Sequence, residues 1–150
     1  MRSYAHAMTS ASRAVLITGC SSGIGRATAL RLLRSGWTVY ATARRPETLG
    51  ELEREGAHTL ALDVTDEGSM RAAVSAVQEA EGAVGVLVNN AGYSQSGALE
   101  TVPIDSARRQ FETNVFGLAQ ILDRLQAPRG RVHVPAAPRQ AERRGAADAG

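Results

Sequence analysis

The sequence predicts an α/β fold in which a doubly wound parallel sheet lies between two layers of helices. Apolar runs of strand length alternate with amphipathic runs of helix length, and the segments that connect them are short. Strands are expected at 14–18, 37–43, 58–62 and 84–89, with a further candidate at 131–134. Helices are expected at 24–35, 46–55, 66–80 and 104–125.

Helical periodicity is clearest in two of these segments. In helix 66–80 the apolar residues that recur on one face are Met70, Ala73, Val74 and Val77. Asp66 is expected to cap this helix, because its carboxylate can accept an unpaired backbone N–H. In helix 104–125 the apolar residues at steps of four and three are Phe111, Val115, Leu118, Leu122 and Leu125. We expect that stripe to lie in the core.

One domain is expected, over residues 13–125. A chain of 150 residues is long enough to bury roughly two-thirds of its unfolded surface. Residues 1–12 lack the apolar run of a signal peptide and are predicted to form a disordered extension. Residues 126–150 are rich in Ala, Arg, Pro and Gly, with almost no apolar periodicity, and are predicted to form a disordered tail.

Composition argues against several classes of partner. The arginines of the tail have no interleaved aromatic residues, so a solvated tail is favoured over one that binds nucleic acid. No apolar run approaches the roughly 20 residues that span a bilayer, so no membrane partner is expected. His6, His58 and His133 lie far apart without ligand companions, so we expect no metal site. The single Cys20 fits a reducing compartment, and we expect a cytoplasmic protein.

A glycine-rich turn, T-G-x-x-x-G-x-G over residues 18–25, joins the first strand to the first helix. Gly19 can adopt positive φ, while Gly23 and Gly25 allow a ligand and the strand to approach the helix closely. The N-terminus of the helix offers unpaired N–H groups and a positive dipole end, which suit a pyrophosphate. A tight turn that binds no ligand remains the alternative at this point.

Three further motifs follow in order along the chain. An apolar strand ends on Asp63, another ends on Asn89 and Asn90, and Asn114 stands inside a helical pattern. Together with the glycine-rich turn, over about residues 13–122, they resemble the short-chain dehydrogenase/reductase superfamily. The resemblance implies a Rossmann-type fold and an NAD(P)-dependent oxidoreductase that transfers hydride between nicotinamide and a small-molecule carbonyl or alcohol.

The resemblance also implies which residues bind the cofactor. Asp63 would bond the adenine and Val64 would pack on it, while Asn90, Ala91 and Gly92 would line the adenosine ribose. The turn residues implied to bind the dinucleotide are Gly19, Ser21, Ser22, Gly23, Ile24 and Gly25. Two alternatives stay open: Asp63 could cap the next helix, and residues 89–92 could be turn chemistry alone.

The end of the second strand favours NADP(H) over NAD(H). It carries no acidic residue that could accept hydrogen bonds from the adenosine 2′-hydroxyl. Arg44 stands there instead, placed for a 2′-phosphate. The alternative is that Arg44 and Arg45 form a solvated pair before Pro46.

The family's catalytic residues are only partly present. All 17 basic residues are Arg, so the Tyr-x-x-x-Lys pair, in which the lysine lowers the pKa of the tyrosine, cannot occur. Of the catalytic tetrad only Asn114 has its motif, and in family members this asparagine holds a water of the proton relay. The segment after Gly130 resembles the family's fifth strand, yet the position expected for the catalytic serine is Ala137.

We therefore expect a cofactor-binding fragment that is inactive as a dehydrogenase, truncated or frameshifted after about residue 122. Its sheet would be incomplete at the C-terminus, and the family's dimer interface would be lost. One alternative is an active oxidoreductase that relies on a partner chain or an unrecognised acid. A second alternative is a cofactor-sensing or interaction module.

Overall fold

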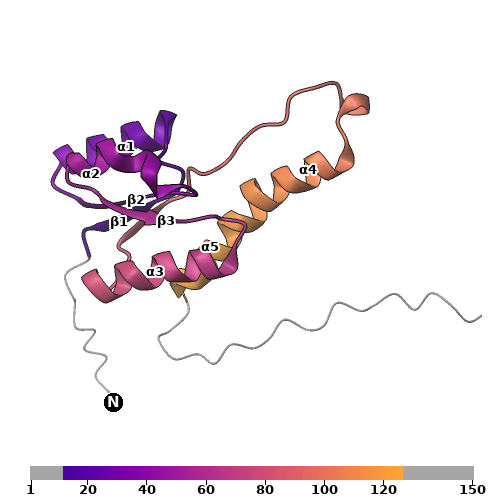
Figure 1. Ribbon diagram of the computed structural model, residues 1–150. Helices are drawn as coiled ribbons and strands as arrows, with labels where there is room; N and C mark the ends of the chain where they lie inside the picture. The colour runs from indigo at the N-terminus through magenta and orange to yellow at the C-terminus, as the bar shows by residue number, and fades with distance from the viewer. Residues whose placement is uncertain (1–11, 127–150) are drawn as a thin grey trace, which may run out of the picture.

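The computed structural model describes residues 12–126 and contains a four-stranded parallel sheet flanked by helices (Figure 1). The strands are β1 (Ala14–Ile17), β2 (Thr38–Ala43), β3 (His58–Ala61) and β4 (Val86–Val88). The α-helices are α1 (Gly23–Arg34), α2 (Gly50–Arg54), α3 (Glu67–Glu81), α4 (Ile104–Phe111) and α5 (Gly117–Gln126). Two 3₁₀ turns and one π-helical turn complete the set: η1 (Pro46–Leu49), η2 (Leu99–Thr101) and η3 (Glu112–Phe116).

The strands lie in the order β3-β2-β1-β4, and every neighbouring pair is parallel. Helices α1 and α2 cover one face of the sheet, and α3 and α5 cover the other (Figure 1). The predicted three-layer Rossmann-type fold is therefore confirmed. The chain moves outward from β1 to β3 and then crosses back to β4, so the strand order reverses between β1 and β4. Ligands of open parallel sheets bind at the carboxyl ends of the strands beside such a reversal.

Side chains of β1 alternate between the two faces, as a strand requires. Ala14 and Leu16 pack in the cluster that holds α3 and α5, whereas Val15 and Ile17 pack in the cluster that holds α1 and α2. All four residues are fully buried because β1 is covered on both faces and paired on both sides. This burial explains why the strand reads as a continuous apolar run.

The expected strands within the described range are confirmed, with ends that differ by at most two residues. Asp66 caps α3 as predicted, since its Oδ1 accepts the backbone N–H of Ser69 at 2.8 Å. The segment expected as one helix over 46–55 is instead the 3₁₀ turn η1 followed by the short helix α2. The candidate strand at 131–134, the extension up to residue 11 and the tail from 127 on lie outside the described residues.

The apolar stripe predicted to be core in helix 104–125 is mostly exposed, so that prediction was wrong. Phe111 is 57% exposed and Leu122 is 40% exposed, and only Leu125 of the stripe packs against the core. The exposed members of the stripe are Phe111, Val115, Leu118 and Leu122.

The inner face of this segment differs from the stripe. Gly117, Ile121 and Leu125 form the inner face of α5, whereas Leu118 and Leu122 are exposed. The segment also contains a π-helical turn that the periodicity did not show, since α4 is followed by η3 and then by α5. In addition, α4 projects beyond the sheet, where none of the described elements covers it (Figure 1).

Candidate functional site

The glycine-rich turn adopts the backbone conformations that its glycines allow. Gly19 has φ +73° and Gly23 has φ +57°, both in the left-handed region that side chains disfavour. Gly25 is buried in the first turn of α1, and a Cβ there would lie 2.4 Å from both the Gly19 carbonyl oxygen and Nδ2 of Asn90. Gly25 is thus required for packing inside the protein, whereas a Cβ on Gly23 would meet no atom within 4 Å.

A hydrogen-bond network ties this turn to the end of β4. Thr18 Oγ1 accepts the backbone N–H groups of Asn90 and Ala91 at 3.0 and 2.9 Å. In return, Nδ2 of Asn90 donates to the carbonyl oxygens of Thr18 and Gly19 at 3.0 and 2.9 Å. Asn90 therefore holds two loops together, and the buried Thr18 is a site residue that the sequence prediction missed. Its position directly before Gly19, at the end of β1, was the available signal.

The N-terminus of α1 is open toward the turn. Ser22 is the N-cap residue but makes no side-chain capping hydrogen bond, and the first turn contains no acidic residue. The leading N–H groups of the helix are therefore left for an external acceptor, and no nearby carboxylate competes for them. Ser21 and Ser22 are exposed beside this terminus.

A cavity of about 910 Å³ lies at the carboxyl ends of the strands, within the range of roughly 300–1,000 Å³ typical of small-molecule sites. It brings together most of the predicted cofactor residues: Gly19, Ser21, Ser22, Ile24, Arg44, Asp63, Val64, Asn90, Ala91 and Gly92. Gly23 and Gly25 shape the turn without lining the cavity. Asn114 does not line the cavity either.

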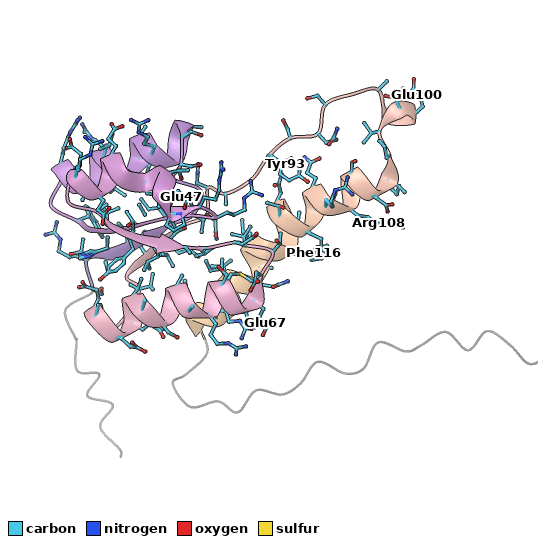
Figure 2. All side chains as sticks on the ribbon, in the orientation of Figure 1. Glu47, Glu67, Tyr93, Glu100, Arg108 and Phe116 are labelled. Atoms are coloured by element: carbon cyan, nitrogen blue, oxygen red, sulfur yellow. The ribbon has the colours of Figure 1, made fainter. Side chains whose placement is uncertain are left out.

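Arg44 lines the cavity just after β2, and it is exposed. Within residues 12–126 its side chain forms no ion pair and no hydrogen bond. The nearest carboxylate along the chain is Glu47 on η1 (Figure 2), which does not line the cavity. Asp63, which follows the neighbouring strand β3, does line it, but no ion pair joins it to Arg44.

Asp63 is held by the turn that follows β3. Its Oδ1 accepts the backbone N–H of Thr65 at 2.9 Å and the Thr65 hydroxyl at 2.7 Å. The alternative in which Asp63 caps the next helix is wrong, because Asp66 performs that role. These bonds use one carboxylate oxygen of Asp63 and leave Oδ2 for a ligand.

Asn114 lies in the π turn and binds the loop that follows β4. Its Oδ1 accepts the backbone N–H of Tyr93 at 3.1 Å, and its Nδ2 donates to the Tyr93 carbonyl at 2.7 Å. A Cβ on Gly92 would lie 3.1 Å from Oδ1 of Asn114, so Gly92 permits this close approach. The arrangement fixes Tyr93, which lines the cavity. π turns of this kind are frequent at functional sites.

Seven lining residues were not predicted: Ala43, Leu62, Thr65, Tyr93, Arg109, Glu112 and Thr113. Arg109, Glu112 and Thr113 have the i, i+3, i+4 spacing of one helix face, so the sequence did carry a signal. The apolar stripe of the same segment was the stronger signal, and it does not include these three residues. Cys20, buried in the glycine-rich turn, is not a reactive group, because burial raises the pKa of its thiol to about 11.

No group of three or more His, Cys, Asp or Glu side chains in the described part of the chain could hold a metal ion. None of its helices is both long and apolar enough to cross a membrane.

Comparison with known proteins identifies the family to which these elements belong. Residues 13–127 match the short chain dehydrogenase family. The chain belongs to this family. The match contains the whole turn, the cavity and the helices on both faces of the sheet.

The chain is also similar to individual oxidoreductases. An uncharacterized oxidoreductase, YusZ of Bacillus subtilis, is 43% identical over an alignment of 114 residues that covers 71% of this chain and 40% of the relative. A 3-ketodihydrosphingosine reductase of Bacteroides thetaiotaomicron is 40% identical over 108 residues, with 71% of this chain and 38% of the relative covered. The chain thus spans less than half the length of these curated relatives.

Solved structures give the same result. A short-chain dehydrogenase from Streptomyces avermitilis superposes with a TM-score of 0.72 at 41% identity, covering 76% of this chain and 43% of that one. A 3-ketoacyl-(acyl-carrier-protein) reductase from Brucella melitensis, complexed with NADH, superposes with a TM-score of 0.71 at 31% identity, covering 75% and 48%. Members of the family bind nicotinamide dinucleotides, and the cavity lies where a Rossmann-type sheet holds such a ligand.

Proposed function

We propose that this chain is the cofactor-binding part of a short-chain dehydrogenase and that its cavity binds NADP(H) in preference to NAD(H). One observation carries the proposal. Three groups line one cavity: an uncapped helix N-terminus, an Arg44 side chain that forms no ion pair within residues 12–126, and an Asp63 carboxylate with one oxygen left for a ligand. These three features match the three polar parts of the ligand, which are the pyrophosphate, the 2′-phosphate and the adenine.

Each part of the dinucleotide has residues suited to hold it. The pyrophosphate would lie against the N-terminus of α1, where Ser21 and Ser22 add hydroxyl donors. Adenine would lie beside Asp63 and Val64, and Oδ2 of Asp63 can accept from its amino group. The backbone at Ala91, held by Thr18, would line the adenosine ribose.

The preference for NADP(H) rests on Arg44. Within residues 12–126 its guanidinium has no ion pair, so a 2′-phosphate would give it a charge-assisted hydrogen bond and a 2′-hydroxyl nothing comparable. Such a bond contributes about 1.5–3 kcal/mol, which corresponds to roughly tenfold to hundredfold in affinity. Asp63, the cavity carboxylate that follows the neighbouring strand β3, already accepts two hydrogen bonds from Thr65.

When bound, a nicotinamide cofactor supplies the hydride that the family transfers to or from a carbonyl or alcohol carbon. The 150 residues contain no lysine, so they provide no Tyr-x-x-x-Lys pair to hold and move the accompanying proton. We therefore expect the 150-residue chain by itself to bind cofactor without turnover. NADPH oxidation against a panel of ketones and aldehydes tests this, and oxidation above the blank that scales with chain concentration would contradict it.

Calorimetry with the two cofactors tests the binding proposal. The wild-type chain should bind NADPH roughly tenfold to hundredfold more tightly than NADH. Arg44→Ala should remove that difference by weakening NADPH alone. Arg45→Ala is the matched control, because Arg45 is the adjacent arginine and does not line the cavity. Equal loss of NADPH and NADH in Arg44→Ala would show that the arginine acts through structure.

A further inference from the structure

The cavity has a second wall, built by α4 and the π turn η3 through Arg109, Glu112 and Thr113. Gly117, where α5 begins, packs directly on Val64: a Cβ on Gly117 would lie 2.5 Å from the Val64 carbonyl oxygen and 3.0 Å from its Cβ. Thr113 and Arg109 precede Gly117 by four and eight residues, and both line the cavity. The helix face that meets Val64 therefore continues past the adenine side of the cavity and ends on Arg109.

The Arg109 side chain forms no ion pair with a carboxylate within residues 12–126. Its Nη2 donates to Oγ of Ser106 at 2.9 Å. Its side chain is exposed at the cavity, so contact with a ligand would cost it no buried interaction.

The neighbouring Arg108 differs from Arg109 in its ion pair and in the surface that it lines. It forms an ion pair with Asp105 at 2.9 Å and lines a separate groove with Phe111 and Phe116. Figure 2 places Arg108 and Phe116 on the side of this helical segment away from Tyr93, which lines the cavity. Two consecutive arginines therefore serve different surfaces, and only Arg109 faces the cavity.

We propose that Arg109 is a binding residue for the adenine of the dinucleotide, with its planar guanidinium stacked on the ring. This inference rests on the proposed function above. Arg44 follows β2, whereas Arg109 lies on the helix face that continues from Gly117, which packs on Val64. The two arginines would thus approach the adenosine from different elements, with Arg109 on the side of the ring rather than of the 2′-phosphate. Guanidinium groups stack on planar rings of this kind.

Calorimetry on the 150-residue chain with NADPH and NADH tests the assignment. Arg109→Ala should raise the Kd of both cofactors by about two- to fivefold, since both carry the same adenine. Arg108→Ala is the matched control and should leave both values unchanged. Arg109→Gln keeps a donor for Ser106 but has no guanidinium, so it must show the same loss as Arg109→Ala. Nicotinamide mononucleotide, which has no adenine, should bind all four proteins equally.

Three other outcomes would overturn the inference. Unchanged Kd values in both Arg109 variants would do so while leaving the proposed function intact. A loss confined to NADPH would overturn it as well, because it would mean that Arg109 contacts the 2′-phosphate. Absence of binding of either cofactor to the wild-type chain would overturn the proposed function and this inference together.

Discussion

Two regions of the sheet differ in how completely their strands are covered. Residues 14–81 form β1, β2 and β3 with their helices, and β1 in this region is fully buried. Residues 86–126 form β4 and the helices after it, and here Val86 is 38% exposed on a strand that, among the described strands, pairs only with β1. A parallel strand is stable when both its faces and both its edges are covered. Strand β1 has that cover, because β2 and β4 pair with its two edges, whereas no described strand covers the second edge of β4. We call residues 14–81 the closed region and residues 86–126 the open region.

The cavity lies where these two regions meet. Thr18 and Asn90 connect the glycine-rich turn to the end of β4, and Val64 meets Gly117 on the far side. Ligand binding therefore depends on how well the open region is held against the closed one. Substitutions at the contacts between the regions test this dependence.

The largest effect is expected for Gly25→Val, at the contact between the glycine-rich turn and Asn90. The new side chain would collide with the Gly19 carbonyl and the Asn90 amide, both of which are fixed in the network that joins the regions. We expect a loss of about 3 kcal/mol or more in the free energy of unfolding, together with loss of cofactor binding. Urea denaturation followed by circular dichroism measures the first quantity and calorimetry the second.

Gly23→Ala is the comparison for that variant. The alanine has room but must adopt φ near +57°, at a cost of about 1–2 kcal/mol. It should reduce stability less than Gly25→Val and weaken cofactor binding at the helix N-terminus. Equal losses of stability in the two variants would mean that Gly25 is not packed against Asn90 as described.

The second prediction compares neighbouring residues of α5. Ile121 is fully buried and Leu122 is 40% exposed, although the apolar stripe in the sequence includes Leu122 and omits Ile121. Ile121→Ala should lower the free energy of unfolding by about 2–5 kcal/mol through the cavity that it leaves. Leu122→Ala should change the same quantity by well under about 1 kcal/mol, as surface substitutions do. Thermal and urea denaturation of both variants give the comparison. A larger loss of stability in Leu122→Ala than in Ile121→Ala would mean that the apolar stripe is the inner face of α5.

Much of the closed region could be predicted because its local signals agree with its final environment. The buried β1 reads as a continuous apolar run, Asp66 caps α3, and Gly19 has the positive φ expected of it. These features depend on residues close in sequence. The chemistry of the cavity could be predicted for the same reason, since strand ends and the turn carry most of its lining.

The open region resisted prediction because its inner helix face is set by long-range packing. The apolar stripe includes Leu118 and Leu122, whereas Gly117 packs on Val64 and Ile121 is fully buried. Arg109, Glu112 and Thr113 were missed although they share a helix face, because their spacing does not show that this face lines the cavity. Long-range contacts of this kind are set by tertiary packing.

The smallest expected effect concerns Tyr40, which holds β2 to α3 within the closed region. Its hydroxyl donates to Glu81 at 2.9 Å, and its ring stacks on His58 with centroids 4.7 Å apart. Tyr40→Phe keeps the ring and removes only the hydrogen bond. It should therefore lower the free energy of unfolding near neutral pH by about 1 kcal/mol.

The same residue makes the stability of the chain sensitive to alkali. Burial, with the hydrogen bond and the negative charge of Glu81, raises the pKa of Tyr40 from 10.0 to about 12. Because the folded state holds this proton more tightly than the unfolded state, the stabilisation is complete below pH 10 and is lost as the pH rises toward 12. The chain has no lysine, so no lysine titration overlaps that of Tyr40 in this pH range.

Urea denaturation between pH 8 and pH 12 measures this effect. The free energy of unfolding should fall more steeply with pH for the wild-type chain than for Tyr40→Phe. Cys20 titrates at lower pH, with a thiol pKa of about 11, and is present in both proteins, so it cancels in the difference. Parallel declines in the two proteins would show that the Tyr40 hydroxyl does not hold β2 to α3.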